Sequence, residues 1–266
     1  MAIRCWRKSV MVLLGAVTLL FSGLVCSAAD KPPPGSEWSE LQRRYRGVFV
    51  LSAPRESRKV ALTFDDVPDP RFTPQVLDVL NTKHVRATFF VVGTRMLKHP
   101  DLLKRIDRDG HDIGNHSYSH PDFSRIPLDK VQQQIIRSEE IVEKLVGFKP
   151  KLVRPPYGEI RPAQLDWAKQ QGYTVVNWDV DSRDWRQLTA DEVFRNVTSA
   201  VRPGSVILMH AGGGEGQNLL GTVQALPRII DWLRNHHYEP VPLTELLDVR
   251  ENREDSTNLF PPFGLP

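Results

Sequence analysis

The sequence predicts an α/β protein in which about seven parallel strands form an open sheet or a distorted barrel. One observation is the alternation of strand-like and helix-like segments from Lys59 onward. Another is that five apolar runs each end in carboxylates, imidazoles or a guanidinium group. Polar groups repeated at the C-terminal ends of strands are the means by which an α/β barrel builds one active site from distant segments. The pattern therefore predicts an enzyme, and specifically a metal-dependent hydrolase.

The first 29 residues have the pattern of an export signal. Three basic residues fall within the first eight positions, residues 9–25 are apolar, and residues 27–29 are small, as a signal peptidase requires. The alternative is an uncleaved membrane anchor, because the apolar run is close to the lower limit of ~17 residues for spanning a bilayer. We expect residues 1–29 to be a signal peptide or an N-terminal membrane anchor, and the protein to be secreted or held at the cell surface or cell wall.

Loss of this segment changes the charge and the cysteine content. The chain has 35 basic and 32 acidic residues, so removing three basic residues leaves 32 of each sign. A domain so close to neutral gives no reason to expect a nucleic-acid partner. Both cysteines, Cys5 and Cys26, also precede residue 30. The exported domain is therefore expected to contain no disulfide and no thiol chemistry.

Composition divides the rest of the chain into three parts. Residues 30–58 are rich in proline, serine and charge, and are expected to be a linker with one short segment around residues 45–51. Residues 59–249 carry the alternating pattern and form the expected catalytic domain. Residues 250–266 are expected to be a loose C-terminal tail.

Strands are predicted where apolar, β-branched or aromatic runs are bounded by turn residues. These runs are residues 59–64, 87–92, 111–114, 151–154, 173–178, 205–209 and, from a weaker pattern, 239–241.

Helices are predicted between these strands from their start and stop signals. Thr73 is the expected N-cap of one helix, with Pro74 in its first turn, and Gly147 is the expected C-terminal stop of another. The predicted helices are residues 73–83, 101–109, 128–146, 162–171, 189–201 and 220–235.

Asp65 and Asp66 stand side by side at the end of the first predicted strand. Successive strand residues point to opposite sides, so one carboxylate can bind a metal while the other faces the substrate as a base. The alternative is a solvated turn, because the residues that follow are typical of loops.

His116 and His120 are four residues apart. This spacing lets two imidazoles converge on one ion if the segment turns helically, although such pairs also occur on surfaces by chance. Together with an Asp carboxylate they supply three ligands and leave positions open for water and substrate. That arrangement is typical of a catalytic zinc-type site.

Other polar side chains follow the later strands. Arg154 precedes two prolines that stiffen its loop, and it can orient a carboxylate or form a salt bridge at the barrel rim. Trp185, beside Asp184, offers a flat face that suits a sugar ring or belongs to the core. His210 ends an apolar run and precedes a glycine-rich loop, which makes it the best placed candidate for a general acid.

Taken in order, these motifs resemble those of the polysaccharide deacetylases, also called carbohydrate esterase family 4 or the NodB homology domain. They are Thr63-Phe64-Asp65-Asp66, His116-Ser117-Tyr118-Ser119-His120, Arg154-Pro155-Pro156-Tyr157-Gly158, Asp181-Ser182-Arg183-Asp184-Trp185 and Leu208-Met209-His210. Five motifs in this order are far more specific than any one alone. The resemblance covers residues 59–249 and implies a distorted, NodB-like (β/α) barrel, often with seven strands.

The resemblance also implies the roles of the site residues. Asp65 would be the general base that activates water, and Arg154 would hold it. The ligands of a divalent metal would be Asp66, His116 and His120. Zinc is the first candidate for that metal, and cobalt, nickel or manganese are the others.

The remaining implied roles concern proton donation and the pocket. Asp184 would tune His210, the general acid that protonates the leaving amine. The backbone N–H of Tyr157 would help to stabilise the oxyanion. Trp185 and Leu208 would line the pocket for the acetyl group and the sugar ring.

Two features depart from the family pattern. Val67 stands where the family usually has glycine, and a β-branched residue resists positive φ, so the loop is expected to follow another path. Asp179 adds a carboxylate near the expected site without an assigned role.

The sequence thus predicts an exported, metal-dependent hydrolase that removes N-acetyl groups from N-acetylglucosamine-type units of peptidoglycan or a chitin-like polymer. Two alternatives stay open: an O-acetyl esterase acting on a polysaccharide such as xylan, and a glycan-binding module without turnover. The expected partner is the acetylated polysaccharide, and a membrane only if the N-terminal segment is retained. The sequence does not predict the oligomeric state.

Overall fold

A parallel β-sheet curls into a half-barrel in the computed structural model, which describes residues 36–249. Eight strands follow the order β1-β6-β5-β4-β3-β2-β8-β7, and β9 pairs with β2 outside this path. All pairings between named strands are parallel. The strands are β1 Phe49–Val50, β2 Lys59–Val67, β3 Thr88–Val91, β4 Asp112–Asn115, β5 Leu152–Val153, β6 Thr174–Val176, β7 Val180–Asp181, β8 Val206–His210 and β9 Glu239–Pro240.

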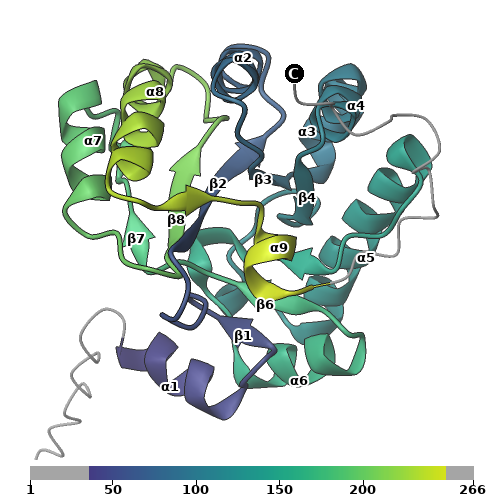
Figure 1. Ribbon diagram of the computed structural model, residues 1–266. Coiled ribbons are helices and arrows are strands. Elements are labelled where there is room, and N and C mark those ends of the chain that lie inside the picture. The colour runs from purple at the N-terminus through teal and green to yellow at the C-terminus, as the bar shows by residue number, and fades with distance from the viewer. Residues whose placement is uncertain (1–35, 250–266) are drawn as a thin grey trace, which may run out of the picture.

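Helices cover the outer side of the strands, and Figure 1 shows α2, α4, α7 and α8 in this position. The α-helices are α1 Ser36–Arg44, α2 Thr73–Thr82, α3 Gly93–Lys98, α4 Pro100–Arg108, α5 Leu128–Val146, α6 Pro162–Gln170, α7 Ala190–Thr198, α8 Leu220–Asn235 and α9 Leu243–Leu247. Short 3-10 turns are η1 Phe123–Arg125, η2 Pro156–Gly158 and η3 Asp184–Arg186. The architecture confirms the predicted α/β class and the distorted barrel of parallel strands, with eight strands in the main path where about seven were predicted.

The main hydrophobic core lies between the central strands and these helices. Phe64 of β2 stacks on Phe89 of β3 with ring centroids 5.2 Å apart. Strands covered on both faces need near-continuous apolar sequences, which explains why β2 and β8 are so clear in the sequence. The core therefore fixes the strand ends that carry the polar motifs.

The seven predicted strands correspond to β2, β3, β4, β5, β6, β8 and β9, and the six predicted helices to α2, α4, α5, α6, α7 and α8. The bounds of α5 and α8 are as predicted. Gly147 follows α5 with a φ of 86°, the left-handed conformation that a glycine stop requires. The strands β1 and β7 and the helices α1, α3 and α9 were not predicted. α1 lies in the Pro-, Ser- and charge-rich segment that was expected to be a linker, and the other four elements have two to six residues each.

Thr73 is not the N-cap of α2, and that prediction was wrong. Phe72 holds the N-cap position, and the Thr73 side chain does not cap the helix. Instead, the Thr73 hydroxyl accepts a bond from the Asp69 N–H and donates to the Ala211 carbonyl, at 2.8 Å each. The side chain thus joins two loops rather than closing a helix end.

Part of the segment expected to be a linker is structured. α1 and β1 pack against the sheet, with β1 paired to β6, and Tyr45 and Phe49 are buried. The predicted signal or anchor, the first residues of the linker and the predicted tail lie outside the described residues. Within residues 36–249, none of the helices has the length and apolar character needed to cross a bilayer.

Candidate active site

A pocket of about 280 Å³ opens where the C-terminal ends of the central strands meet. It is lined by Asp65, Asp66, His116, His120, Tyr157, Trp178, Asp181, Trp185, Leu208 and His210. Eight of these ten are site residues predicted from the sequence. The other two predicted residues, Arg154 and Asp184, are buried and bond to Asp65 and His210. The structure therefore brings all of the predicted site residues to one place.

The two neighbouring carboxylates face the same pocket. β2 continues to Val67, and strand alternation alone would send Asp65 and Asp66 to opposite sides. Asp66 instead has a φ of 63°, which breaks the regular alternation. Both side chains consequently line the pocket, although only Asp65 is fully enclosed.

Three side chains could hold a metal ion: Asp66, His116 and His120. One ligand atom from each lies within 4.8 Å of the other two. The Asp66 Oδ1 atom is 3.4 Å from His120 Nε2 and 4.0 Å from His116 Nε2, and the two Nε2 atoms are 3.2 Å apart. Two imidazoles and one carboxylate are the N/O ligand set that zinc and similar divalent ions accept.

The protonation state of His116 suits a metal ligand. Its Nδ1–H donates to the Arg154 carbonyl at 2.7 Å, which leaves the Nε2 lone pair directed at the shared centre. Burial, followed by the repulsion of His120, lowers the pKa of His116 to about 3. The imidazole is therefore neutral at neutral pH, as a metal ligand must be.

The segment between the two histidines is a loop and not the helical turn that the spacing suggested. Ser117 and His120 both have positive φ, 70° and 61°. The His120 N–H donates to Ser117 Oγ, and the Ser117 N–H donates to Asn115 Oδ1, both at 2.9 Å. Local side-chain bonds thus produce the convergence that a helix would otherwise give.

Arg154 fixes the position of Asp65 from below the pocket. Its Nη1 donates to Asp65 Oδ1 at 2.7 Å and to Thr63 Oγ1 at 2.8 Å, and its Nε donates to the Val176 carbonyl at 2.9 Å. Burial lowers the pKa of Arg154, while the Asp65 carboxylate opposes that change. The second Asp65 oxygen, Oδ2, stays on the pocket side, 3.6 Å from His116 Nε2.

His210 and Asp184 form a second buried pair on the other side of the pocket. The Asp184 carboxylate accepts bonds from the ring Nδ1 and the backbone N–H of His210, both at 2.8 Å, and from Thr222 Oγ1 at 2.7 Å. Burial opposes the charge on His210, but the Asp184 carboxylate outweighs it and raises the pKa to about 9. The imidazole is therefore protonated at neutral pH.

Replacing Asp184 with Asn is expected to reverse this pKa shift. Without the carboxylate, burial is the dominant influence, and it should take the pKa of His210 from about 9 to below its usual 6.5. NMR titration of the His210 ring in the two proteins measures the change directly. A His210 pKa that stays near 9 in the variant would show that Asp184 is not its cause.

The outer part of the pocket is aromatic. Tyr157 and Trp185 are 63% and 49% exposed, so two large rings stand at the rim, where a polymer could approach them. The Tyr157 ring lies edge-on to His120, with centroids 4.8 Å apart. Leu208, on β8, closes the inner wall.

Two sequence features take on a different meaning in the structure. The residue with positive φ after Asp65 is Asp66, and Val67 ends β2 without needing that conformation. Asp179 does not face the pocket. Its carboxylate accepts bonds from Arg55, Ser205 and the Val206 N–H, and so fixes the start of β8.

Trp178 and Asp181 line the pocket, and Thr222 holds Asp184, yet none of the three had a predicted role. Asp181 belongs to a recognised motif and could have been identified by its place after a strand. Thr222 lies inside α8, 38 residues from Asp184, and no local signal marks it.

Comparison with known proteins identifies the family of this chain. The family model for polysaccharide deacetylase matches residues 52–176, which include the motifs from Asp65 to Tyr157. A peptidoglycan-N-acetylglucosamine deacetylase of Bacillus cereus is 42% identical over 217 residues, covering 82% of this chain and 78% of that protein. A chitooligosaccharide deacetylase of Bradyrhizobium is 36% identical, covering 71% and 91%.

Solved structures of similar fold also come from this family. A peptidoglycan N-acetylglucosamine deacetylase in complex with 4-naphthalen-1-yl-N-oxidanyl-benzamide superposes with a TM-score of 0.78 at 42% identity, over 81% of this chain and 99% of that one. A pseudoenzyme of carbohydrate esterase family 4 from Bacillus anthracis has a TM-score of 0.70 at 26% identity, over 76% and 69%. Sequence and fold together show that the chain belongs to the polysaccharide deacetylase family.

Proposed function

We propose that this protein hydrolyses N-acetyl groups on N-acetylglucosamine units of peptidoglycan or a chitin-like polymer, and that it needs a divalent metal. The observation that carries this proposal is that a candidate base and a candidate acid, each fixed by a buried partner, lie beside one candidate metal site. Asp65 is oriented by Arg154, and His210 is oriented by Asp184, whose carboxylate keeps the imidazole protonated. The names of the similar deacetylases support the same substrate class.

Asp66, His116 and His120 would hold the cation, with zinc as the first candidate and cobalt, nickel or manganese as the others. A divalent cation there supplies Lewis acidity toward the acetyl carbonyl oxygen and toward water.

Asp65 acts as the general base in this proposal. Its Oδ1 is occupied by Arg154, so Oδ2 is the oxygen free to take the proton of the attacking water. The buried guanidinium keeps this carboxylate in one orientation, which favours reaction over reorientation.

His210 acts as the general acid. An amine is a poor leaving group unless nitrogen is protonated as the C–N bond breaks, and His210 carries that proton at neutral pH. His210 and Asp65 are register partners on adjacent strands β8 and β2, so the acid and the base flank one substrate position.

The remaining residues bind and orient the substrate. The Tyr157 N–H is assigned to the developing oxyanion, where one preorganised donor typically contributes about 3–4 kcal/mol. Trp185 and Leu208 would pack on the sugar ring and the acetyl methyl group.

The two alternatives are less well supported. An O-acetyl esterase would have less use for a protonated His210, because an alkoxide leaves more readily than an amide nitrogen. A glycan-binding module without turnover is a real option in this family, since one similar structure is described as a pseudoenzyme. In this chain, however, the candidate base, acid and three ligands are all present.

Acetate release from N-acetylated chitooligosaccharides and from peptidoglycan tests the proposal. Chelation is expected to lower the rate by about 10³-fold or more, because several kcal/mol of charge stabilisation are lost with the cation. Zinc or cobalt added back should restore it. Acetate release that continues in protein shown by elemental analysis to contain no metal would contradict the metal requirement. Oligosaccharide binding without any acetate release would favour the binding module.

A further inference from the structure

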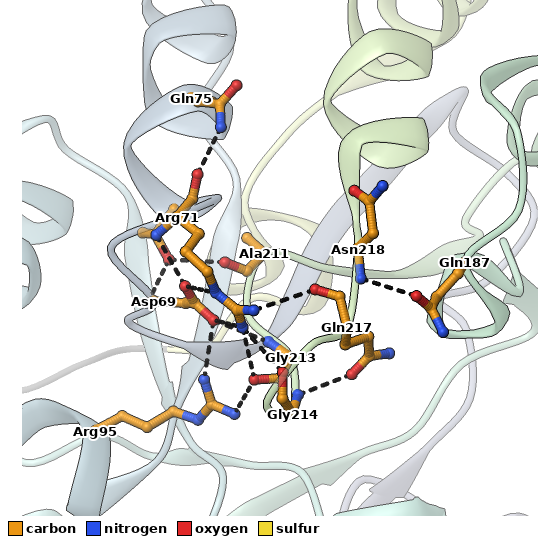
Figure 2. A network of polar contacts seen from close by, with 11 residues as sticks. Asp69, Arg71, Gln75, Arg95, Gln187, Ala211, Gly213, Gly214, Gln217 and Asn218 are labelled. Carbon is orange, nitrogen blue, oxygen red and sulfur yellow. Dashed lines mark hydrogen bonds and ion pairs between the residues drawn. The ribbon is translucent and has the colours of Figure 1, made fainter.

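A polar network outside the predicted catalytic groups joins the loops that surround the pocket (Figure 2). Its centre is Asp69, in the loop between β2 and α2, whose side chain is 3% exposed. The Asp69 Oδ1 accepts bonds from the N–H and Nε of Arg71 at 2.9 and 3.0 Å, and Oδ2 accepts from Arg71 Nη2 at 2.7 Å. Burial favours the neutral carboxyl, but the bonds from Arg71 hold the pKa of Asp69 below its usual value.

Asp69 also bonds to the backbone of the loop that follows His210. Its Oδ2 accepts from the Gly213 N–H at 3.2 Å and lies 3.4 Å from Arg95 Nη1. Arg95 Nη2 donates to the Gly213 carbonyl at 2.8 Å, and Arg71 Nη2 donates to the carbonyls of Gly213 and Gly214 at 3.1 Å each. Figure 2 shows both guanidinium groups converging on Asp69 and on this loop. One buried anion therefore keeps two cations in place to hold residues 211–217.

A close approach of backbone to backbone requires glycine at position 212 of this loop. A Cβ atom on Gly212 would lie 1.8 Å from the Asp66 carbonyl oxygen, and one on Gly213 would lie 2.7 Å from Gln217 Oε1. The loop thus packs directly on the backbone of a candidate metal ligand, where no side chain fits.

Gln217 carries the network to the rim of the pocket. Its Oε1 accepts from the Gly214 N–H at 2.8 Å, and its Nε2 donates to the Trp185 carbonyl at 2.9 Å. Trp185 sits on η3, whose short turn is bounded by left-handed residues at Arg183 and Gln187. Gln217 therefore ties the backbone of the turn that carries the exposed indole to the Asp69 network, while the Trp185 side chain itself bonds to the Asp181 carboxylate.

In the part of the chain that the structure describes, the network makes no bond to the His210 side chain. Although Asp184 belongs to the same turn as Trp185, Thr222 of α8 also holds the Asp184 carboxylate. The ring and N–H of His210 bond to Asp184, and His210 pairs with Asp65 across β8 and β2. Loss of the network should accordingly affect the rim and leave the general acid in place.

We propose that Asp69 is a positioning residue for Trp185, which acts through Arg71, Arg95, residues 211–217 and Gln217. This inference rests on the proposed function, and it assigns the network to binding of the glycan rather than to the chemical step. Interactions made equally with the ground state and the transition state change KM and not kcat.

Three variants test the proposal in acetate-release kinetics with tetra-N-acetylchitotetraose. Asp69→Asn removes the anion, Gln217→Leu cuts the link to Trp185, and Asp231→Asn is the matched control, since it breaks the exposed Lys83–Asp231 pair. Asp69→Asn and Gln217→Leu should raise KM by about fivefold or more and change kcat by less than about threefold. The control should behave as wild type.

Unchanged KM in Gln217→Leu, or a fall in kcat with KM constant, would overturn the proposal. If Asp69→Asn does not fold, Gln217→Leu still tests the proposal, because the Gln217 side chain is only partly buried.

Hydrogen exchange followed by mass spectrometry separates this inference from the proposed function. In protein without substrate, peptides that contain residues 184–187 should exchange faster in both Asp69→Asn and Gln217→Leu than in wild type. In Asp69→Asn, peptides that contain residues 211–217 should also exchange faster. Exchange that is unchanged at residues 184–187 in both variants would overturn the inference. A wild-type protein that releases no acetate would instead refute the proposed function, while the exchange data would still decide whether Asp69 positions the rim.

Discussion

Replacing Asp65 with Asn is expected to lower the rate of acetate release by about 10²–10⁴-fold, the usual effect of losing a general base. Asn has nearly the same shape and still offers an oxygen to Arg154 Nη1, but it cannot accept a proton from water. The loss should therefore appear in kcat and in kcat/KM alike, because the missing interaction belongs to the transition state.

The neighbouring carboxylate provides the matched control for this prediction. Asp66→Asn should weaken zinc binding by about tenfold or more, whereas Asp65→Asn should keep its zinc, since only Asp66 belongs to the three-ligand cluster. Isothermal titration with zinc distinguishes the two variants. An Asp65→Asn protein with more than about a tenth of wild-type activity would remove Asp65 from the role of base.

Asp65→Asn also leaves the fully buried Arg154 without its anion. Breaking a buried pair from one side typically costs about 3–5 kcal/mol, and the retained amide oxygen offsets part of that cost. Kinetics must therefore be measured well below the unfolding midpoint of the variant, which chemical denaturation provides. A folded but inactive Asp65→Asn protein is the result that supports the base.

The sequence was sufficient to predict most of the fold because buried parallel strands leave long apolar runs. β8 is an apolar run that ends at His210, and β2 is mostly apolar up to Phe64, where the two aspartates follow. β1 and β7 were not predicted as strands; each has only two residues, and pairing with β6 and β8 defines them. Short edge elements are thus set by tertiary contacts that local sequence does not encode.

The candidate site was predictable for a related reason. Groups such as Asp65 and His116 lie at the C-terminal ends of strands, so their positions relative to one another are fixed once the sheet is known. Groups that act from other elements were not predictable: Thr222 bonds to Asp184 from the first turn of α8, and Asp69 stands in a segment whose residues are typical of a loop. The backbone of Asp66 illustrates the limit, because its positive φ reverses the side expected from strand alternation.

Replacing His210 with Asn is expected to damage amide hydrolysis far more than ester hydrolysis. Loss of a general acid typically costs about 10²–10⁴-fold when the leaving group must be protonated, as the sugar amine must. A phenolate needs no proton to leave, so hydrolysis of 4-nitrophenyl acetate should fall by only about tenfold or less. The two rates measured on the same variant, compared with wild type, give the ratio.

The ratio is informative because His210 does not belong to the three-ligand cluster, so the metal content of the variant should equal that of wild type. Asp184→Asn supplies an independent check: it keeps the imidazole but lowers its pKa, so its amide activity should shrink most at high pH, where the ring is neutral. Equal damage to amide and ester substrates in His210→Asn would mean that His210 does not protonate the leaving nitrogen. The O-acetyl esterase would then become the better reading of this pocket, because the remaining groups, Asp65 and the three candidate ligands, serve both reactions equally.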